Sequence, residues 1–347
     1  MGVGYVRTSR RFAPRTVGLA ALAGLAALNA LAYVGLELLG PRIVSFALIV
    51  GVEAEFTLTS LTFWGVASRL FSIQQARRLF GLVSAGEVIP TVVGGLALPW
   101  LVEEVGVWNL LLISVAGHAA AAIALLAVED TADQHPTEED ASPPRAAGAA
   151  EIAQRRYLRW LAALVALNVF VYYAVDNAFY HATQQASLGT GALAAFLGDF
   201  FVALGLLSLA FKVFLSGRWR TWLGLRVSLL SVPATLAVLG GVVLLSQGTL
   251  HTATGALLAV VLLKLWERVS IEAIHVPSLH ALLLPLPGPT REAARGTLDG
   301  VVAHSATLIT GGVLLALNQS LELGVVGLTA VTLLALLLWG VFALRVR

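Results

Sequence analysis

The chain has 347 residues, of which 58% are hydrophobic and 12% are charged, and its mean hydropathy is +0.85. Soluble domains carry roughly 25% charged residues, so this balance excludes a water-soluble globular protein and predicts that apolar surface faces lipid. The sequence has no cysteine, which excludes disulfides and thiolate metal sites. Its net charge of +2 does not indicate nucleic-acid binding, because the arginines flank apolar segments.

Apolar runs long enough to cross about 30 Å of hydrocarbon as helices recur along the chain. The first run follows a positively charged start and is too long for a cleavable signal peptide, so it is predicted to be retained. Runs of this length are typical of helices rather than of short barrel strands. The predicted fold class is all-α, a polytopic membrane helical bundle with ten transmembrane helices. They are expected at 16–39, 43–67, 79–101, 106–128, 157–179, 189–213, 222–246, 250–272, 296–318 and 322–344.

A hydrophilic stretch rich in Ala, Pro and acidic residues separates the fourth span from the fifth. Its composition is typical of a flexible linker. The predicted organisation is therefore four helices plus six: an N-terminal arm at 1–15, a four-helix bundle at 16–128, the linker at 129–156, and a six-helix bundle at 157–347.

Positive charge is distributed unevenly between the two sides of the predicted membrane. Arg42 falls on one side, and the remaining 21 of the 22 Lys and Arg residues fall on the other. Because cationic loops tend to stay in the cytoplasm, both termini and the linker are predicted to be cytoplasmic. The chain is expected to be an integral protein of a bacterial inner (cytoplasmic) membrane.

Glycine pairs interrupt three of the predicted spans, at Gly94-Gly95, Gly240-Gly241 and Gly311-Gly312. Small residues allow close approach of neighbouring helices in membranes, and they also allow a helix to bend. Both interpretations, tight helix contact and a gating hinge, stay open at this point.

Three stretches of sequence resemble a known transporter family. The first is Phe63-Trp64 followed by Gln74-Gln75-Ala76-Arg77-Arg78-Leu79-Phe80-Gly81-Leu82 and Gly94-Gly95; the second is Asp176-Asn177-Ala178-Phe179 with Ala194-Ala195-Phe196-Leu197-Gly198-Asp199-Phe200-Phe201; the third is Leu284-Pro285-Leu286-Pro287 with Arg291, Arg295 and Asp299-Gly300-Val301-Val302. Together they are similar to the nucleotide (ATP/ADP) translocase family and its bacterial relatives in the major facilitator superfamily.

The resemblance implies a transporter built of two six-helix halves joined by a cytoplasmic linker. The six spans after the linker match a complete second half, and the four spans before it look like helices three to six of the first half. The first two helices of that half are then absent from the chain, and a protein partner that supplies them is one expectation. The implied substrate is a small polar solute such as a nucleotide.

Polar residues in the second span lie on one face of the predicted helix, because they are spaced by three or four positions. They are Glu53, Thr57, Ser60, Trp64 and Ser68, whereas Glu55 points about 200° away from Glu53. A carboxylate near the middle of the bilayer is costly unless it is hydrated, paired or protonated. Glu53, Thr57 and Trp64 are therefore candidates for a solute cavity or proton coupling, with an interhelical hydrogen bond as the alternative.

Charged residues in the later spans supply further candidates. Asp176 and Asp199 are intramembrane acids, although Asp176 is also compatible with an interfacial position. The predicted end of the eighth span carries Lys264, Glu267, Arg268 and Glu272, and the pairs 264/267, 264/268 and 268/272 are three or four positions apart, so Glu267 and Glu272 can neutralise the two cations. We expect an inner gate network here, with snorkelling of long side chains at a cytoplasmic helix end as the alternative.

The sequence as a whole predicts a secondary-transporter-type membrane protein that moves a small polar solute by alternating access. A non-transporting sensor or scaffold that keeps the transporter fold is the alternative. No nucleophile, phosphate loop or zinc signature is evident in the sequence, so neither an enzyme nor a cofactor is expected. His118 and His304 are predicted to be packed, hydrogen-bonded side chains rather than metal ligands. The expected partners are the lipid bilayer and the solute, with no nucleic acid.

Overall fold

A computed structural model describes most of the apolar sequence. The described residues are 14–45, 88–127, 156–186, 188–249, 253–283, 294–321 and 323–345, together with 47, 48, 51, 52, 55, 58, 59, 62 and 63. Within these ranges the regular structure is entirely helical. The elements are α2 (Pro14–Leu39), α5 (Val88–Glu104), α6 (Leu110–Ala127), α8 (Arg156–Gln185), α9 (Thr190–Ala210), η3 (Phe211–Leu215), α10 (Ser216–Thr249), α11 (Ala253–Ser270), η4 (Ile271–His275), α12 (Val276–Leu283), η5 (Thr297–Val302), α14 (Ala303–Leu321) and α15 (Val325–Arg345).

Seven helical segments are long and apolar enough to cross a bilayer, which identifies the chain as an integral membrane protein. They are Arg15–Leu39, Leu110–Ala127, Arg156–Gln185, Thr190–Leu215, Trp222–Ser246, Ala294–Ser320 and Val325–Arg345. These segments correspond to seven of the ten predicted spans. The other three predicted spans are the second, the third and the eighth. The second lies mostly outside the described residues, and the third is described only from Val88 onward, as part of the 17-residue α5. The eighth, α11, contains three charged side chains.

The chain divides into two compact units. Unit 1 contains Met1–Gly86 and Leu98–Pro143, and unit 2 contains Glu87–Ala97 and Pro144–Arg347. The third predicted span thus contributes residues to both units, whereas the predicted boundaries place it wholly in the first bundle. The predicted linker at 129–156 lies outside the described residues except for Arg156, which is the first residue of α8.

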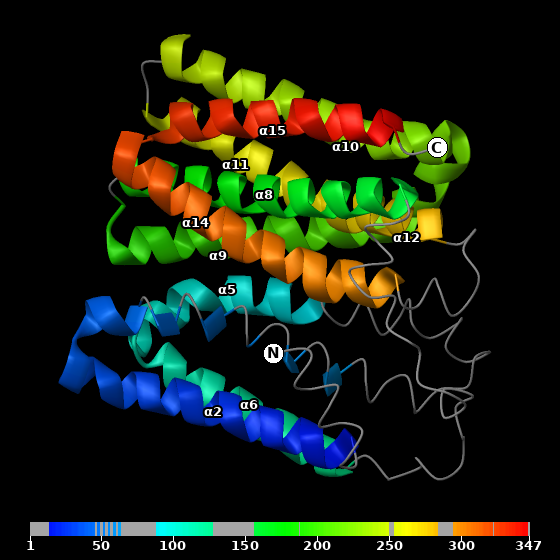
Figure 1. Cartoon of the computed structure of the whole chain (residues 1–347). Helices are drawn as coiled ribbons and strands as arrows, with labels where there is room; N and C mark the ends of the chain where they lie inside the picture. The colour runs from blue at the N-terminus through cyan, green and yellow to red at the C-terminus, as the bar shows by residue number, and fades with distance from the viewer. Residues whose placement is uncertain are drawn as a thin grey trace. The chain divides into compact units, whose positions relative to one another are not determined.

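The core of unit 1 forms between α2 and α6, which pack side by side (Figure 1). Val17, Leu22 and Leu25 of α2 are buried at helical spacing. Gly18 lies where the helices approach closely, because a Cβ there would come within 2.9 Å of the Leu125 side chain on α6. The Tyr33 hydroxyl also donates a hydrogen bond to Asn109 Oδ1 at 2.9 Å.

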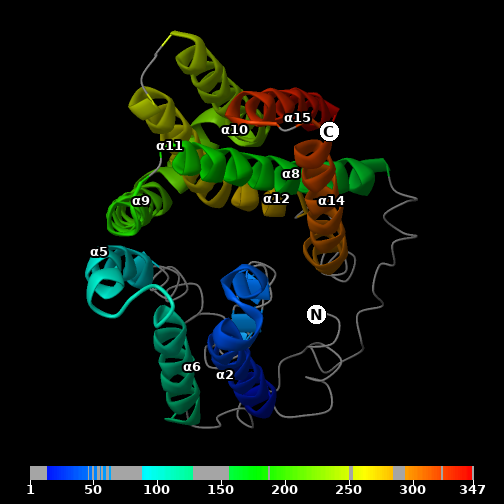
Figure 2. The ribbon, with the colours of Figure 1, turned by 90° about the vertical axis from the view of Figure 1, so that its left-hand side faces the viewer.

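In unit 2, α8 packs against α11, α14 and α15, and α10 covers the outer side of α11 and α15 (Figures 1 and 2). The α8 residues Leu158, Leu161 and Leu164 have no exposed surface. On the face of α14 and α15 away from this core, Leu308 and Leu337 are exposed, as expected for helices in lipid. The unit is therefore a helical bundle whose interior is centred on α8.

The glycines of the three pairs differ in how closely a neighbouring helix approaches them. A Cβ at Gly95 would lie 2.7 Å from the Gly198 carbonyl oxygen of α9, and a Cβ at Gly240 would lie 3.0 Å from the Leu333 side chain of α15. Gly94 and Gly241, their immediate neighbours, face open space in the described part of the chain. Close helix contact thus accounts for one glycine of each of these two pairs. Gly311 and Gly312 have no such neighbour among the described atoms.

Two predicted span boundaries differ from the structure. The predicted loop between residues 213 and 222 is helical, and the break in α10 comes instead at Gly224, where φ is 74° and ψ is 164°. This backbone conformation favours glycine because it has no Cβ. The eighth span, predicted to end at residue 272, continues through the π turn η4 into α12 and ends at Leu283. Pro277 is the second residue after this turn, and its missing N–H and bulky ring disfavour a regular α-helix in the preceding turn.

Candidate functional site

Lys264 of α11 forms the centre of a buried charged cluster in unit 2. Its Nζ lies 2.8 Å from Asp176 Oδ1 of α8 and donates a hydrogen bond to Glu267 Oε2 at 2.7 Å. Lys264 is 4% exposed and Glu267 has no exposed surface. One ammonium group is therefore shared by two carboxylates and joins α11 to α8.

Helical spacing explains how these side chains meet. Lys264 and Glu267 are three positions apart on α11, and Tyr172 and Asp176 are four positions apart on α8, so each pair lies on one face of its helix. The two helices pack against each other. The Tyr172 ring lies 4.4 Å from Lys264 Nζ and 5.1 Å from the Arg268 guanidinium carbon. These are cation–π distances, so the ring supports both cations from α8.

A second layer of ion pairs extends the cluster toward η3 and η4. Glu272 Oε1 lies 3.7 Å from Arg268 on α11, and Glu272 Oε2 lies 2.9 Å from Lys212 on η3. The Lys212, Arg268 and Glu272 side chains are about one-third exposed, so solvent screens this layer more than it screens Lys264. The complete set contains the acids Asp176, Glu267 and Glu272 and the bases Lys212, Lys264 and Arg268. We call it the charged cluster.

Burial of the charged Lys264 and Glu267 side chains costs free energy. Moving an ion from water into a low-dielectric interior costs several kcal/mol, and this cost is offset only when every charge is paired and hydrogen-bonded. Glu267 meets this requirement for pairing and hydrogen bonding only in part, because its Oε1 atom is buried and has no hydrogen-bond partner among the described residues. A bundle that needed only stability would gain more from apolar side chains at these positions. The cluster therefore marks a candidate functional site.

Four of the predicted site residues come together in the charged cluster: Asp176, Lys264, Glu267 and Arg268. Lys264 and Glu267 are buried, which does not favour the alternative in which long side chains snorkel to solvent. They lie in the C-terminal part of α11, and the helical segment continues through η4 and α12 to Leu283.

Asp199 is separate from this cluster. It lies on α9, its side chain is exposed, and it forms no ion pair with any residue that the structure describes. The adjacent Gly198 and Phe200 are buried, so the carboxylate projects away from the core of unit 2. The remaining candidates, Glu53, Thr57 and Trp64, lie outside the described residues.

The sequence analysis missed the part that Tyr172 plays in the charged cluster and, separately, the contact between Glu55 and His118 in unit 1. Tyr172 has no charge and lies in an apolar stretch, so only its position four residues before Asp176 connects it with the cluster. In unit 1, Glu55 lies 3.3 Å from His118 Nε2 on α6, while His118 Nδ1 lies 2.8 Å from the Ser114 carbonyl oxygen. Because a carbonyl oxygen only accepts, Nδ1 donates to Ser114, and Nε2 faces the Glu55 carboxyl group. His118 is thus a packed, hydrogen-bonded side chain, as predicted, whereas His304 on α14 is exposed.

The described residues contain no cluster of three or more His, Asp or Glu side chains that is suited to a metal ion. No protein-family model matches the chain, and no curated protein matches it significantly. Inferences about function thus depend on the geometry of the cluster and on the sequence patterns.

Proposed function

We propose that this protein is a secondary transporter of the bacterial cytoplasmic membrane that moves a small polar solute by alternating access. The proposal includes ten membrane-crossing helices of the major facilitator type and cytoplasmic termini. The observation that carries it is the charged cluster, in which Lys264 on α11 is shared by Asp176 on α8 and Glu267 on its own helix. Ionisable groups inside membrane bundles are usually functional, because their burial is costly.

The geometry of the cluster suggests how solute binding would be coupled to movement of α8 relative to α11. Lys264 holds α8 and α11 together while it is bound to Asp176, and it has a second carboxylate available on α11. An anionic solute that binds Lys264 or Arg268 would compete with these carboxylates and weaken the link between the helices. Binding energy would then be coupled to helix movement, which is the requirement for alternating access.

The solute class follows from the same groups and from the sequence resemblance. Lys212, Lys264 and Arg268 are three cations within one connected cluster, and Tyr172 offers an aromatic face beside two of them. Phosphate groups bind to such cations, and nucleobases stack on aromatic rings. Together with the resemblance to nucleotide translocases, this supports a nucleotide or a similar phosphorylated solute.

Uptake into proteoliposomes tests the proposal. The purified full-length chain is reconstituted and supplied with labelled nucleotides, inorganic phosphate and small dicarboxylates. We expect saturable uptake of at least one solute, and at least a tenfold loss in the Lys264→Gln variant. Arg159→Gln is the matched control, since it removes an exposed positive charge from α8 outside the charged cluster. Unchanged uptake in Lys264→Gln would exclude the cluster from transport.

One observation favours the alternative function, a non-transporting sensor or scaffold. In the described structure both lysines are already engaged by carboxylates, Lys264 by Asp176 and Glu267, and Lys212 by Glu272. A cluster in which both lysines are already paired could serve only to hold α8, α11, η3 and η4 together. Absence of flux for every solute in the panel, with a protein that copurifies at fixed stoichiometry, would support this alternative instead.

A further inference from the structure

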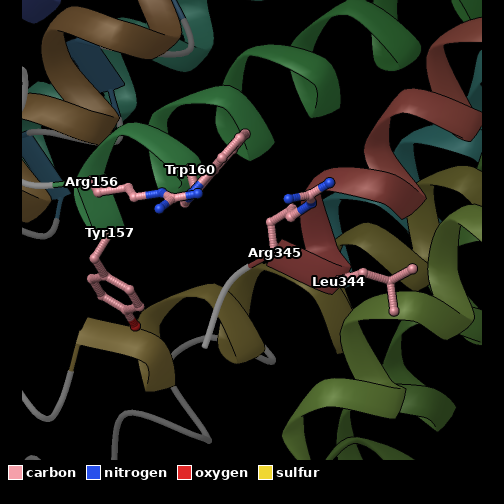
Figure 3. Close-up of a pocket in the computed structure, with 5 residues that line it drawn as sticks. All are labelled: Arg156, Tyr157, Trp160, Leu344 and Arg345. Carbon is pink, nitrogen blue, oxygen red and sulfur yellow. The ribbon is translucent and has the colours of Figure 1, made fainter.

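A pocket of about 610 Å³ opens in unit 2 at the end of the bundle where α8 begins and α15 ends (Figure 3). It is lined by Arg156, Tyr157 and Trp160 from α8 and by Leu344 and Arg345 from α15. None of these residues belongs to the charged cluster. The pocket therefore needs an explanation that is independent of the proposed transport function.

The aromatic walls of the pocket are held in place. The Tyr157 hydroxyl donates a hydrogen bond to the Leu282 carbonyl oxygen of α12 at 2.5 Å. The Trp160 ring packs against Phe342 of α15, with ring centroids 5.3 Å apart. Both rings are half-buried. A ligand would thus meet a preformed surface and would not have to order these side chains on binding.

The two arginines give the pocket a positive charge. Arg156 and Arg345 are exposed, lie on opposite sides of the opening (Figure 3), and have no carboxylate partner in the part of the chain that the structure describes. The positive end of the α8 dipole and the negative end of the α15 dipole meet here, so their effects oppose each other. The guanidinium groups then determine the electrostatic potential, which favours an anion.

The position of the pocket indicates which anion it binds. α8 and α15 are both long and apolar enough to cross a bilayer, so their adjacent ends lie at the membrane–water interface, where Trp and Tyr are common. Arginine binds phosphate oxygens through paired N–H groups. Leu344 and Trp160 add apolar surface beside these cations, suited to the glycerol and upper acyl carbons of a lipid.

We propose that this pocket binds the headgroup of an anionic phospholipid. The phosphate lies between Arg156 and Arg345, and the upper part of an acyl chain lies against Trp160 and Leu344. A zwitterionic lipid carries the same phosphate, but its cationic choline is repelled by the two arginines. Free phosphate lacks the apolar contacts and is not concentrated at the interface. The site is therefore selective for lipids with net negative charge.

Thermal unfolding of the detergent-solubilised full-length protein tests this proposal. We expect phosphatidylglycerol to raise Tm, while equal concentrations of phosphatidylcholine or inorganic phosphate have little effect. The Arg156→Gln and Arg345→Gln variants should each lose at least half of the shift. Arg159→Gln, which removes a neighbouring exposed arginine outside the pocket, should keep it. Equal stabilisation by phosphatidylcholine or phosphate, or equal loss in Arg159→Gln, would overturn the assignment.

A second measurement does not depend on the folding of the arginine variants. Because the chain has no native cysteine, Leu344→Cys can be labelled at a single position with a fluorophore. Brominated phosphatidylglycerol should quench this label at a several-fold lower mole fraction than brominated phosphatidylcholine. Leu308→Cys on the exposed face of α14 is the matched control and should not discriminate between the lipids. Equal quenching by both lipids at Leu344→Cys would contradict the proposed site.

Discussion

The Lys264 ammonium of α11 lies 2.8 Å from the Asp176 carboxylate of α8, and this ion pair connects two helices through the interior of unit 2. The two residues are 88 positions apart in the chain. Because the same ammonium also binds Glu267, removal of Lys264 leaves two carboxylates in a poorly hydrated environment without their cation.

The Lys264→Met variant is therefore expected to destabilise the protein by about 3–5 kcal/mol, the usual result of breaking a buried ion pair from one side. The free energy of unfolding in mixed micelles measures this effect. The triple variant Asp176→Asn/Lys264→Met/Glu267→Gln removes all three charges and should recover most of the loss. A Lys264→Met protein as stable as the parent would show that the pair contributes nothing to the bundle.

The Tyr172 ring is expected to stabilise the charged cluster through its contacts with Lys264 and Arg268. Tyr172→Leu should cost about 0.5–2 kcal/mol, because it removes the aromatic face while leaving an apolar side chain. Tyr172→Phe keeps the ring and measures the contribution of the hydroxyl alone. The same unfolding assay applies. Equal losses in the two variants would assign the effect to the hydroxyl rather than to the ring.

Glycine 95 is expected to tolerate substitution poorly because α5 and α9 approach each other there. In Gly95→Ala the new Cβ would meet the Gly198 carbonyl oxygen at 2.7 Å, and a backbone atom within a helix cannot easily move away. We expect a loss of about 1–3 kcal/mol. The adjacent Gly94→Ala meets no described atom and should be neutral or stabilising by about 0.5–1 kcal/mol. Similar stability of the two variants would argue against close packing at this position.

The distribution of positive charge predicts the orientation of the chain, and single cysteines can test it since the protein has none of its own. Arg42→Cys should react with a membrane-impermeant maleimide added to intact cells. Arg218→Cys, also at an exposed position, should react only after the membrane is permeabilised. Labelling in the reverse pattern would invert the proposed topology.

Much of the architecture was predictable from local sequence. Hydropathy depends on neighbouring residues alone, and it identified the chain as a helical membrane protein and located the seven segments that the structure supports. The spacing of Lys264 and Glu267 also predicted their pairing, because residues three positions apart on a helix lie on one face whatever surrounds them. These properties were determined by the sequence itself.

The tertiary structure decided what the helices bring together. Whether Asp176 is interfacial or paired depends on the rotation of α8 and on its depth relative to α11, and neither quantity is encoded in a local pattern. The same applies to Tyr172, to the outward direction of Asp199, and to which glycine of each pair meets a neighbour. The sequence determined which surfaces each helix offers; the packing of α8 against α11 determined that a single ammonium group would be shared between them.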